Sequence, residues 1–350
     1  MKQVFMPKSR VLLLKFTMII LVHLFLKGCT INTGAPDPKN PQYKVLFAGA
    51  VGKLRMLWIA NLDGSNRWKL ADLKQEEDIT EVSASFSPDG TKIAYVAQSE
   101  NVIYVINSDG TNRQKITNPI GKQPLFPRWS PDGRRLVFRV QGGDANGSTM
   151  NLFVANADGS NVKQIYSQSF PFYNAYWSPS GEKIAFQKVR LSSLSSIMTI
   201  NADGSNITTL TDTTSAFDDI EPRWLPASKR LIYLTRRREI YSVKEDGTDR
   251  IPFAVGLNVT SLSSPWSPNG QYLIASDGSA SNYLVTISGT YSRISNSESL
   301  FLTIWLPDSE QIITNGGGLT PSIINLDGTN QRQFLEPPAI VLAVSPVPLP

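Results

Sequence analysis

The chain has 350 residues, with 34 Lys and Arg against 29 Asp and Glu, and it contains one histidine and one cysteine. A single cysteine excludes both a disulfide within one molecule and a two-cysteine metal site. Because the only histidine is His23, residues 24–350 lack the side chain on which Ser-His-Asp and Cys-His catalysis and histidine-ligated metal sites depend. We therefore expect no such catalytic machinery, no metal and no other cofactor.

Residues 1–28 are typical of a secretion signal. They contain five basic residues, no acidic residue and an apolar run of 11 residues at 16–26, which is short for a bilayer span. Without these residues the chain has 29 basic and 29 acidic residues, so the remaining part is electrically neutral. A neutral domain gives no electrostatic reason to expect nucleic-acid binding.

This signal ends in Leu26-Lys27-Gly28-Cys29, which resembles a bacterial lipobox. The resemblance implies that Cys29 carries a lipid and that the exported protein is held on a bacterial membrane, facing the periplasm or the exterior. An uncleaved anchor and a secreted protein with an incidental cysteine are the alternatives. Residues 29–42 contain three prolines among polar residues and are predicted to form an extended tether.

Beyond the tether, an aromatic residue followed by Ser-Pro-Asp-Gly, or by a close variant, recurs every 39–48 residues. Proline suits the first turn position and glycine accepts the positive φ that follows, so each copy predicts a hairpin. The copies with Ser228 and Ser309 in place of glycine are expected to be strained there. A period of 40–50 residues indicates stacked supersecondary units. The anchor positions are Phe86, Trp129, Trp177, Trp224, Trp266, Trp305 and Val344.

A second motif, Asn-x-Asp-Gly-x-Asn or a variant, lies between successive copies of the first. It superficially resembles a calcium loop, but the copy that starts at Asn107 has Asn118 where an EF-hand needs glutamate. A hairpin turn is the favoured interpretation, with the asparagine side chains capping the backbone. The seven turns are centred on Asp63-Gly64, Asp109-Gly110, Asp158-Gly159, Asp203-Gly204, Asp246-Gly247, Ser288-Gly289 and Asp327-Gly328.

The two alternating motifs divide each unit into four short strands, named a to d in chain order, and no long helix is expected. The first segment, 43–48, matches strand b, whereas the missing strand a appears at the other end, at 340–346. We therefore predict an all-β, seven-bladed β-propeller of four-stranded blades over 43–346. N-terminal strands b, c and d and C-terminal strand a would close it, and 347–350 would form a tail. Six or eight blades are the alternative count.

The alternating Trp-Ser-Pro-Asp-Gly and Asn-x-Asp-Gly-x-Asn motifs resemble TolB-type, WD40-like β-propeller repeats over nearly all of 43–346. TolB itself has a separate α/β domain before a six-bladed propeller, and we expect neither feature here, so the resemblance is to the repeat family. It implies a role in docking partners near the outer membrane. Similar repeats precede the catalytic domain of prolyl oligopeptidases, and no such domain is expected here.

Propellers commonly bind ligands on the face that carries the d–a and b–c connections. Arg128 and Arg223 occupy equivalent Pro-Arg-Trp positions two blades apart and are candidates for holding an anionic group, unless they pair with acidic residues. The d–a connection between the third and fourth predicted blades is rich in aromatic residues, which would anchor a partner or cap the core. Its candidate residues are Phe170, Phe172, Tyr173 and Tyr176.

Asp218, Asp219 and Glu221 precede the strand that ends at Trp224. Two of these carboxylates could serve glycoside hydrolysis if they were held at the right separation. A solvated acidic loop is the favoured interpretation, because no catalytic motif accompanies them.

Taken together, the sequence favours a non-catalytic envelope lipoprotein whose propeller binds another envelope protein or a peptide, with the membrane reached through a lipid on Cys29. A carbohydrate-binding or polysaccharide-degrading propeller, with carboxylates and aromatic residues at the channel mouth, is the alternative.

Overall fold

The computed structural model describes most of the predicted propeller, and the leader, Cys29 and the tether lie outside the described residues. Within the described ranges every regular element longer than one residue is a β-strand, and no helix there is long and apolar enough to cross a bilayer. The described ranges are 43–51, 54–73, 83–97, 100–116, 124–142, 149–169, 172–189, 194–211, 218–278, 281–294, 303–315, 321–335 and 339–349.

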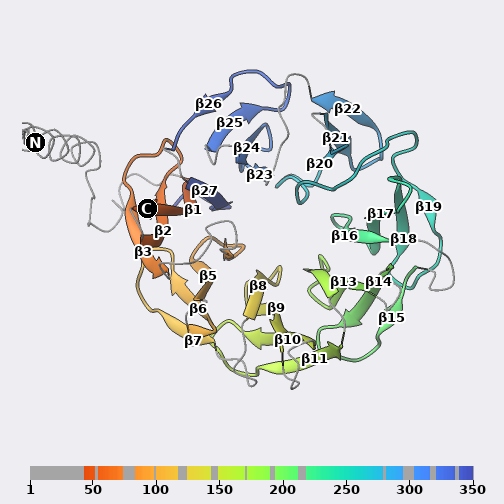
Figure 1. Cartoon of the computed structure of the whole chain (residues 1–350), viewed down its shortest axis with the longest axis horizontal. Coiled ribbons are helices and arrows are strands. Elements are labelled where there is room, and N and C mark those ends of the chain that lie inside the picture. Colours follow the sequence, from red (N-terminus) through yellow and green to blue (C-terminus); the bar gives the residue numbers. More distant parts are fainter. Residues whose placement is uncertain are drawn as a thin grey trace, which may run out of the picture.

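The strands form seven antiparallel sheets arranged as blades around a central axis (Figure 1), which confirms the predicted seven-bladed propeller. Blade 1 comprises β27 (Ala339–Val344), β1 (Lys44–Val51), β2 (Leu54–Asn61) and β3 (Trp68–Leu73). Blade 2 comprises β4 (Ala84–Phe86), β5 (Lys92–Ala97), β6 (Val102–Asn107) and β7 (Gln114–Ile116). Blade 3 comprises β8 (Pro124–Trp129), β9 (Arg135–Gln141), β10 (Met150–Asn156) and β11 (Lys163–Gln168).

The remaining blades follow in chain order. Blade 4 comprises β12 (Phe172–Trp177), β13 (Lys183–Val189), β14 (Ser195–Asn201) and β15 (Thr208–Thr209). Blade 5 comprises β16 (Ile220–Trp224), β17 (Arg230–Leu234), β18 (Ile240–Lys244) and β19 (Ile251–Pro252). Blade 6 comprises β20 (Tyr272–Ser276), β21 (Asn282–Thr286) and β22 (Tyr291–Ile294). Blade 7 comprises β23 (Thr303–Trp305), β24 (Gln311–Asn315), β25 (Pro321–Asn325) and β26 (Arg332–Gln333).

Blade 6 departs from the predicted four strands. In the part of the chain that the structure describes, its strand a is reduced to a single antiparallel bridge between Ser261 and Ser276. The other six blades keep strand a, and in Figure 1 strands such as β8, β16, β23 and β27 lie on the side of their blades nearest the axis. Side chains on these inner strands are therefore placed to meet one another across blade boundaries.

The ring is closed as predicted, because β27 from the C-terminal end pairs with β1 and completes blade 1. The amide of Ser345 donates to the Lys44 carbonyl oxygen at 2.8 Å, and the Lys44 amide donates to the Ser345 hydroxyl oxygen at 2.9 Å. The buried Lys44 ammonium donates to Asn61 Oδ1 at 2.7 Å, so its charge is hydrogen-bonded inside the blade. The pairing covers the inner edge of β1 with a strand from the other end of the chain.

The Ser-Pro-Asp-Gly turns have the predicted geometry. In the first copy the Gly90 amide donates to the Ser87 carbonyl oxygen at 2.9 Å, and Gly90 has a φ of 73°. Ser309 takes the same left-handed conformation with a φ of 61°, as expected of a copy without glycine. The expectation for Ser228 is wrong, because the positive φ in that copy falls on Ala227, at 50°.

The aspartate of this turn organises it through hydrogen bonds. Asp89 accepts bonds from the Ser87 hydroxyl and from the amide and hydroxyl of Thr91. Burial opposes ionisation of Asp89, but these hydrogen bonds outweigh it and hold the pKa of the carboxyl below its usual value. Blade 6 has Asn269 in the same place, whose Oδ1 accepts from the Ser267 hydroxyl at 2.7 Å. An amide oxygen therefore fills the same role without a charge.

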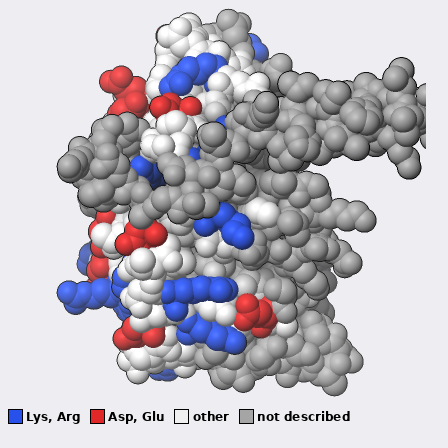
Figure 2. Space-filling model, turned by 90° about the vertical axis from the view of Figure 1, so that its left-hand side faces the viewer, with Lys and Arg blue, Asp and Glu red and all other residues white. Residues whose placement is uncertain are grey.

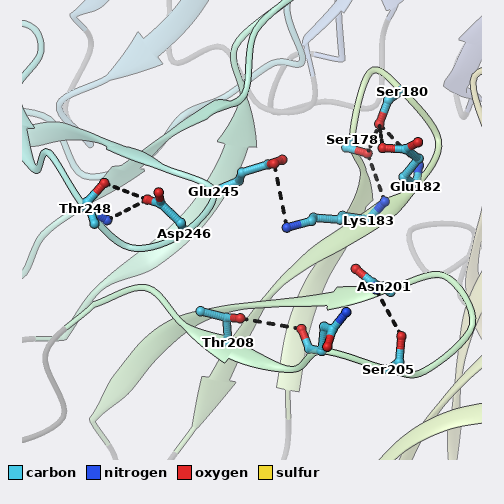
Figure 3. A network of polar contacts seen from close by, with 11 residues as sticks. Ser178, Ser180, Glu182, Lys183, Asn201, Ser205, Thr208, Glu245, Asp246 and Thr248 are labelled. Carbon is cyan, nitrogen blue, oxygen red and sulfur yellow. Dashed lines mark hydrogen bonds and ion pairs between the residues drawn. The ribbon is translucent and has the colours of Figure 1, made fainter.

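The seven c–d turns are also hairpins, and each places its glycine at a positive φ. The prediction that the asparagines cap the backbone is wrong in detail, because the aspartate accepts from the backbone, as Asp246 Oδ1 does from the Thr248 amide at 2.9 Å. The leading asparagine instead donates to a hydroxyl, as Asn201 does to Ser205 (Figure 3). The trailing residue, such as Asn206 at a φ of 51°, ends the turn in the left-handed region.

The apolar core lies between the blades. Among the described residues, seven main clusters of buried side chains each join two neighbouring blades. Successive residues of a strand point to opposite faces, so Val45 packs toward blade 7 while Leu46 packs toward blade 2. A blade is thus buried on both faces by its neighbours, which explains the nearly continuous apolar runs in strands b and c.

The anchor tryptophans add a polar link to these interfaces. The indole Nε1 of Trp177 donates to the Arg128 carbonyl oxygen of the preceding blade at 3.0 Å, and Trp224 makes the same bond to Tyr176 at 3.1 Å. Trp129 and Trp305 repeat this pattern. Trp266 is the exception, because its indole N–H is buried and has no partner among the described residues. The missing bond coincides with the reduced strand a of blade 6.

The glycine of a c–d turn is also needed for packing, and two alanine substitutions test this. Gly289 and Gly133 both have positive φ, 84° and 67°, so each alanine carries a backbone cost of about 1–2 kcal/mol. A Cβ at 289 would lie 2.3 Å from the Phe253 carbonyl oxygen of the preceding blade, whereas at 133 the nearest atom is 3.6 Å away. Gly289→Ala is therefore expected to lower the free energy of unfolding by about 1–3 kcal/mol more than Gly133→Ala. Urea unfolding followed by tryptophan fluorescence measures the difference, and equal losses would contradict the packing role.

Candidate functional site

The candidate residues lie along the inner strands of blades 3, 4 and 5: Phe172 and Tyr173 are where β12 begins, whereas Arg128, Tyr176 and Arg223 are next to the last residue of β8, β12 and β16. The a–b and c–d turns lie on one face of the ring, and the b–c and d–a connections lie on the opposite face, here called the loop face. The first residues of β8, β12 and β16 are nearest the loop face, and so are the last residues of β9. Figure 2 shows one side of the molecule, where basic and acidic side chains are interspersed over the described surface, as expected of a neutral domain.

Tyr176 contacts both candidate arginines. The Arg128 guanidinium carbon lies 4.2 Å from the centre of the Tyr176 ring, and that of Arg223 lies 4.5 Å from it. All three residues directly precede their anchor tryptophan, in three consecutive blades. The three residues therefore occupy equivalent positions in the repeat, and the circular arrangement of the blades brings their side chains together. We call Arg128, Tyr176 and Arg223 the central stack.

The central stack concentrates positive charge without acidic partners. Within the described ranges no ion pair joins Arg128 or Arg223 to a carboxylate, so the alternative in which they pair with acids finds no support among those residues. Burial by itself would raise the pKa of the Tyr176 phenol, but the guanidinium charges of Arg128 and Arg223 outweigh burial and place that pKa below its usual value. The stack is thus an electropositive feature held together by cation–π contacts.

Glu221 and Arg223 hold a main-chain segment of blade 6. Glu221 Oε2 accepts from the Leu262 amide at 2.6 Å, and Arg223 Nη2 donates to the Leu262 carbonyl oxygen at 3.0 Å. Two side chains of β16 therefore bond the main-chain amide and carbonyl of one residue in the region where blade 6 lacks a regular strand a. The Glu221 carboxylate therefore has a structural role, because it accepts a main-chain hydrogen bond from the neighbouring blade.

Asp218 and Asp219, which precede β16, also form hydrogen bonds with the main chain of blade 4. Asp218 Oδ1 accepts from the Ser195 amide at 2.8 Å, and the Asp219 amide donates to the Ser195 carbonyl oxygen at 3.1 Å. The expectation of a solvated acidic loop is wrong for Asp219, because its side chain is buried at 1% exposure. Burial first, and then the Asp219 charge, raise the pKa of the nearby Tyr233 phenol. The Asp218 carboxylate therefore holds a main-chain amide, and the Asp219 carboxylate lies buried near Tyr233.

The aromatic connection divides into a core residue and a surface residue. Phe172 is fully buried and packs edge-on against Tyr166 and Phe186, so its proposed place on a binding face is corrected to the core between blades 3 and 4. Tyr173 is 42% exposed, as expected of a residue that contacts a partner. Phe170 lies outside the described residues. The alternation of a strand explains why adjacent aromatic residues have opposite environments.

Two residues that the sequence analysis did not single out complete the site. Arg139 is 7% exposed, and its guanidinium carbon lies 4.9 Å from the Phe126 ring centre and 5.4 Å from that of Tyr173. Arg139 Nη1 also donates to the Phe172 carbonyl oxygen. Burial, and then the positive charge of Arg128, lower the pKa of Arg139 to about 10, which leaves it charged at neutral pH. We call Arg139, Phe126 and Tyr173 the arginine–aromatic cluster.

The sequence contains a signal for both residues. Arg139 is a charged residue inside Leu136-Val137-Phe138-Arg139-Val140, where blade 2 has Val96 in the equivalent position. Phe126 precedes Pro127 just as Glu221 precedes the proline of the other Pro-Arg-Trp motif. Both Phe126 and Glu221 have a left-handed φ, 50° and 53°, at an irregularity in the strand register. Aligning the repeats position by position would have found both residues.

No metal centre can be assembled from the described part of the chain, where no three side chains of His, Cys, Asp or Glu form a group that could hold an ion. The chemistry that the site offers is that of cations and aromatic rings: binding of anionic and apolar groups by Arg139, the central stack and two exposed rings.

Comparison with known proteins agrees with the geometry. The family described as TolB beta propeller domain matches residues 44–293. A curated relative, named Uncharacterized peptidase YuxL, from Bacillus subtilis (strain 168), is 28% identical over 120 residues, a match that covers 31% of this chain and 18% of that protein. This chain therefore matches less than a fifth of the length of that relative.

Several solved structures share the fold at low sequence identity. An oligogalacturonate lyase from Vibrio parahaemolyticus has a TM-score of 0.62 at 14% identity, over 80% of this chain and 85% of that chain. TolB from Acinetobacter baumannii has a TM-score of 0.51 at 13% identity, over 87% and 83%. A puromycin-hydrolyzing peptidase from Mycobacterium tuberculosis has a TM-score of 0.58 at 10% identity, over 87% and 56%. Since the family match spans more than half of the sequence and the fold agrees with it, the chain belongs to the TolB beta propeller domain family.

Proposed function

We propose that this chain is a non-catalytic propeller that docks an envelope protein or a peptide on its loop face. The observation that carries the proposal is the arginine–aromatic cluster, in which two rings exposed by 46% and 42% stand beside a buried guanidinium. Exposed aromatic residues next to arginine are the side chains that most often dominate protein interfaces. Membership of the TolB propeller family supports the same role by analogy.

An envelope location is part of this proposal. The apolar run at 16–26 and the lipobox-like Leu26-Lys27-Gly28-Cys29 support export and a lipid on Cys29. The tether at 29–42 would then hold the propeller away from the membrane surface, with the loop face free to meet a partner.

The alternative is a propeller that binds or cleaves carbohydrate. Its support is the fold shared with oligogalacturonate lyase, a likeness at 14% identity that concerns architecture alone. The carboxylates that it would use do not favour it, because Asp218 and Glu221 accept hydrogen bonds from main-chain amides. We therefore rank docking first.

Partner capture tests the docking proposal. The full-length protein, immobilised through a C-terminal tag, is exposed to detergent-solubilised envelope extract, and bound proteins are identified by mass spectrometry. We expect Phe126→Ala with Tyr173→Ala to lose at least about 90% of a specifically captured protein, because both rings are surface groups at the proposed interface. Tyr291→Ala removes an equally exposed ring on β22, far along the chain, and serves as the matched control. Equal capture by all variants would contradict docking at this site, and retained glycan in place of protein would favour the alternative.

Substitution of the cysteine tests the anchor. Cys29→Ala is expected to abolish incorporation of a radiolabelled fatty acid and to move the protein from the membrane fraction to a soluble fraction or to an unprocessed precursor, because the acceptor thiol is lost. Fractionation and immunoblotting of cells that express either form provide the measurement. Unchanged labelling in Cys29→Ala would rule out this residue as the lipid site.

Glu221 separates the docking proposal from the enzymatic alternative. Glu221→Ala is expected to lower the free energy of unfolding by about 1–3 kcal/mol, because the Leu262 amide loses its acceptor. Glu245→Ala, which removes a partly exposed ion pair of 3.7 Å to Lys183 (Figure 3), should cost less than about 1 kcal/mol. Urea unfolding measures both. If the isosteric Glu221→Gln kept full stability but abolished turnover of a polysaccharide, the enzymatic alternative would be favoured.

A further inference from the structure

Arg139 is a buried cation at the end of β9 nearest the loop face. Its side chain is 7% exposed, in a strand whose neighbouring positions are apolar. A charge removed from water requires compensation by hydrogen bonds and by an opposite charge. Arg139 donates to the Phe172 carbonyl oxygen, but no carboxylate among the described residues forms an ion pair with it. The nearby charge of Arg128 has the same sign and increases the need for an anion.

The two rings beside Arg139 are held outward by the backbone. Phe126 is 46% exposed with a φ of 50°, and the strand register shifts between Leu125 and Arg128. A bulge of this kind turns a side chain away from the direction that regular pairing would give it. A bulky residue in the left-handed region is strained, and such strain concentrates at binding sites. Tyr173, on the next blade, presents the second ring at 42% exposure.

We propose that the arginine–aromatic cluster binds the carboxylate of a docked peptide, with an apolar side chain next to that carboxylate packing on Phe126 and Tyr173. This deepens the proposed docking function and rests on it. A guanidinium offers several N–H donors in one plane, so a carboxylate can take the bonds that the Phe172 carbonyl leaves unused. The bound anion would supply the opposite charge that the described residues do not give Arg139.

The surroundings favour a peptide over a sugar acid. A sugar needs fixed donors and acceptors for its hydroxyl groups, in addition to an aromatic surface. Among the described acidic side chains in or next to β16, Asp218 already bonds the Ser195 amide and Glu221 already bonds the Leu262 amide. The exposed rings offer apolar contact, which suits a peptide segment that combines an acidic and an apolar residue.

A carboxylate also fits better than a phosphate group. A phosphate dianion usually takes several donors at once, whereas Arg139 is one guanidinium with a bond already made to Phe172. Arg128 and Arg223 could add charge, but both are held against the Tyr176 ring, at 4.2 and 4.5 Å. A singly charged, planar group matches what the cluster leaves available.

Ligand-observed fluorine NMR on the full-length protein in detergent micelles tests the site, with empty micelles as the blank. The probes are 4-fluorophenylacetate, which joins a ring to a carboxylate, and 4-fluorophenylacetamide, which is nearly the same shape without the charge. We expect the protein to broaden the acid signal about tenfold more strongly than the amide signal, because only the acid can pair with the guanidinium. Equal broadening of the two probes would overturn the proposal.

Variants locate the binding. Arg139→Gln is expected to weaken binding of 4-fluorophenylacetate about tenfold or more. Because Arg139 is buried and this variant could fail to fold, Phe126→Ala with Tyr173→Ala provides the second measurement, since both side chains are exposed. This double variant should weaken binding about fivefold through lost ring contacts, while Tyr291→Ala leaves it unchanged. Binding that is the same in the double variant as in the wild type would overturn the proposal.

Competition identifies the source of the carboxylate. N-acetyl-Phe-Asp-amide should displace the fluorinated acid at about a tenth of the concentration that glucuronate requires, since it supplies both an acid and an apolar group. Stronger displacement by glucuronate would overturn the peptide assignment.

The results also distinguish the carboxylate site from the docking proposal. If the double variant lost its captured partner while a folded Arg139→Gln variant still bound the acid normally, docking would stand and the carboxylate site would fall. If binding of the acid depended on Arg139 but no partner were captured, the carboxylate site would stand and docking of an envelope protein would fall.

Discussion

Burial between neighbouring blades is the constraint on which the rest of the structure depends. A single four-stranded sheet cannot cover its own two apolar faces, so each blade needs a neighbour on both sides. Seven clusters of buried side chains meet this need, one for each boundary. The boundary between blades 7 and 1 includes Ala339 and Val341 of β27, so the pairing of β27 with β1 completes the buried surface of the ring.

The same constraint builds the candidate site. Repeat units stacked around an axis place equivalent residues side by side, and the inner strands present them toward the centre. Arg128, Tyr176 and Arg223 occupy one repeat position in three consecutive blades and meet as the central stack. Both guanidinium groups contact the Tyr176 ring, and these cation–π contacts offset part of the repulsion between the like charges. The candidate site is therefore formed by residues at equivalent repeat positions, where the backbone is similar and the side chains differ between blades.

Two strained residues show how one repeat position can serve different ends. Phe126 and Glu221 both adopt the left-handed region just before a proline. Glu221 uses the conformation to bond the Leu262 amide and to secure the blade that lacks a regular strand a. Phe126 uses it to hold a ring in solvent beside Arg139. One contributes to stability, and the other gives the loop face its exposed aromatic surface.

The sequence by itself determined the architecture, because turn chemistry and apolar alternation are local. Glycine at positive φ, and the mismatch between the first strand and the last, were enough to predict seven blades and their closure. The site depended on tertiary structure, because a side chain's surroundings come from other blades. Adjacent residues Phe172 and Tyr173 differ only in the face they occupy, and Asp219 is buried although its segment is acidic. Arg139 and Phe126 lie 13 positions apart, yet only strand pairing and the bulge bring cation and ring together.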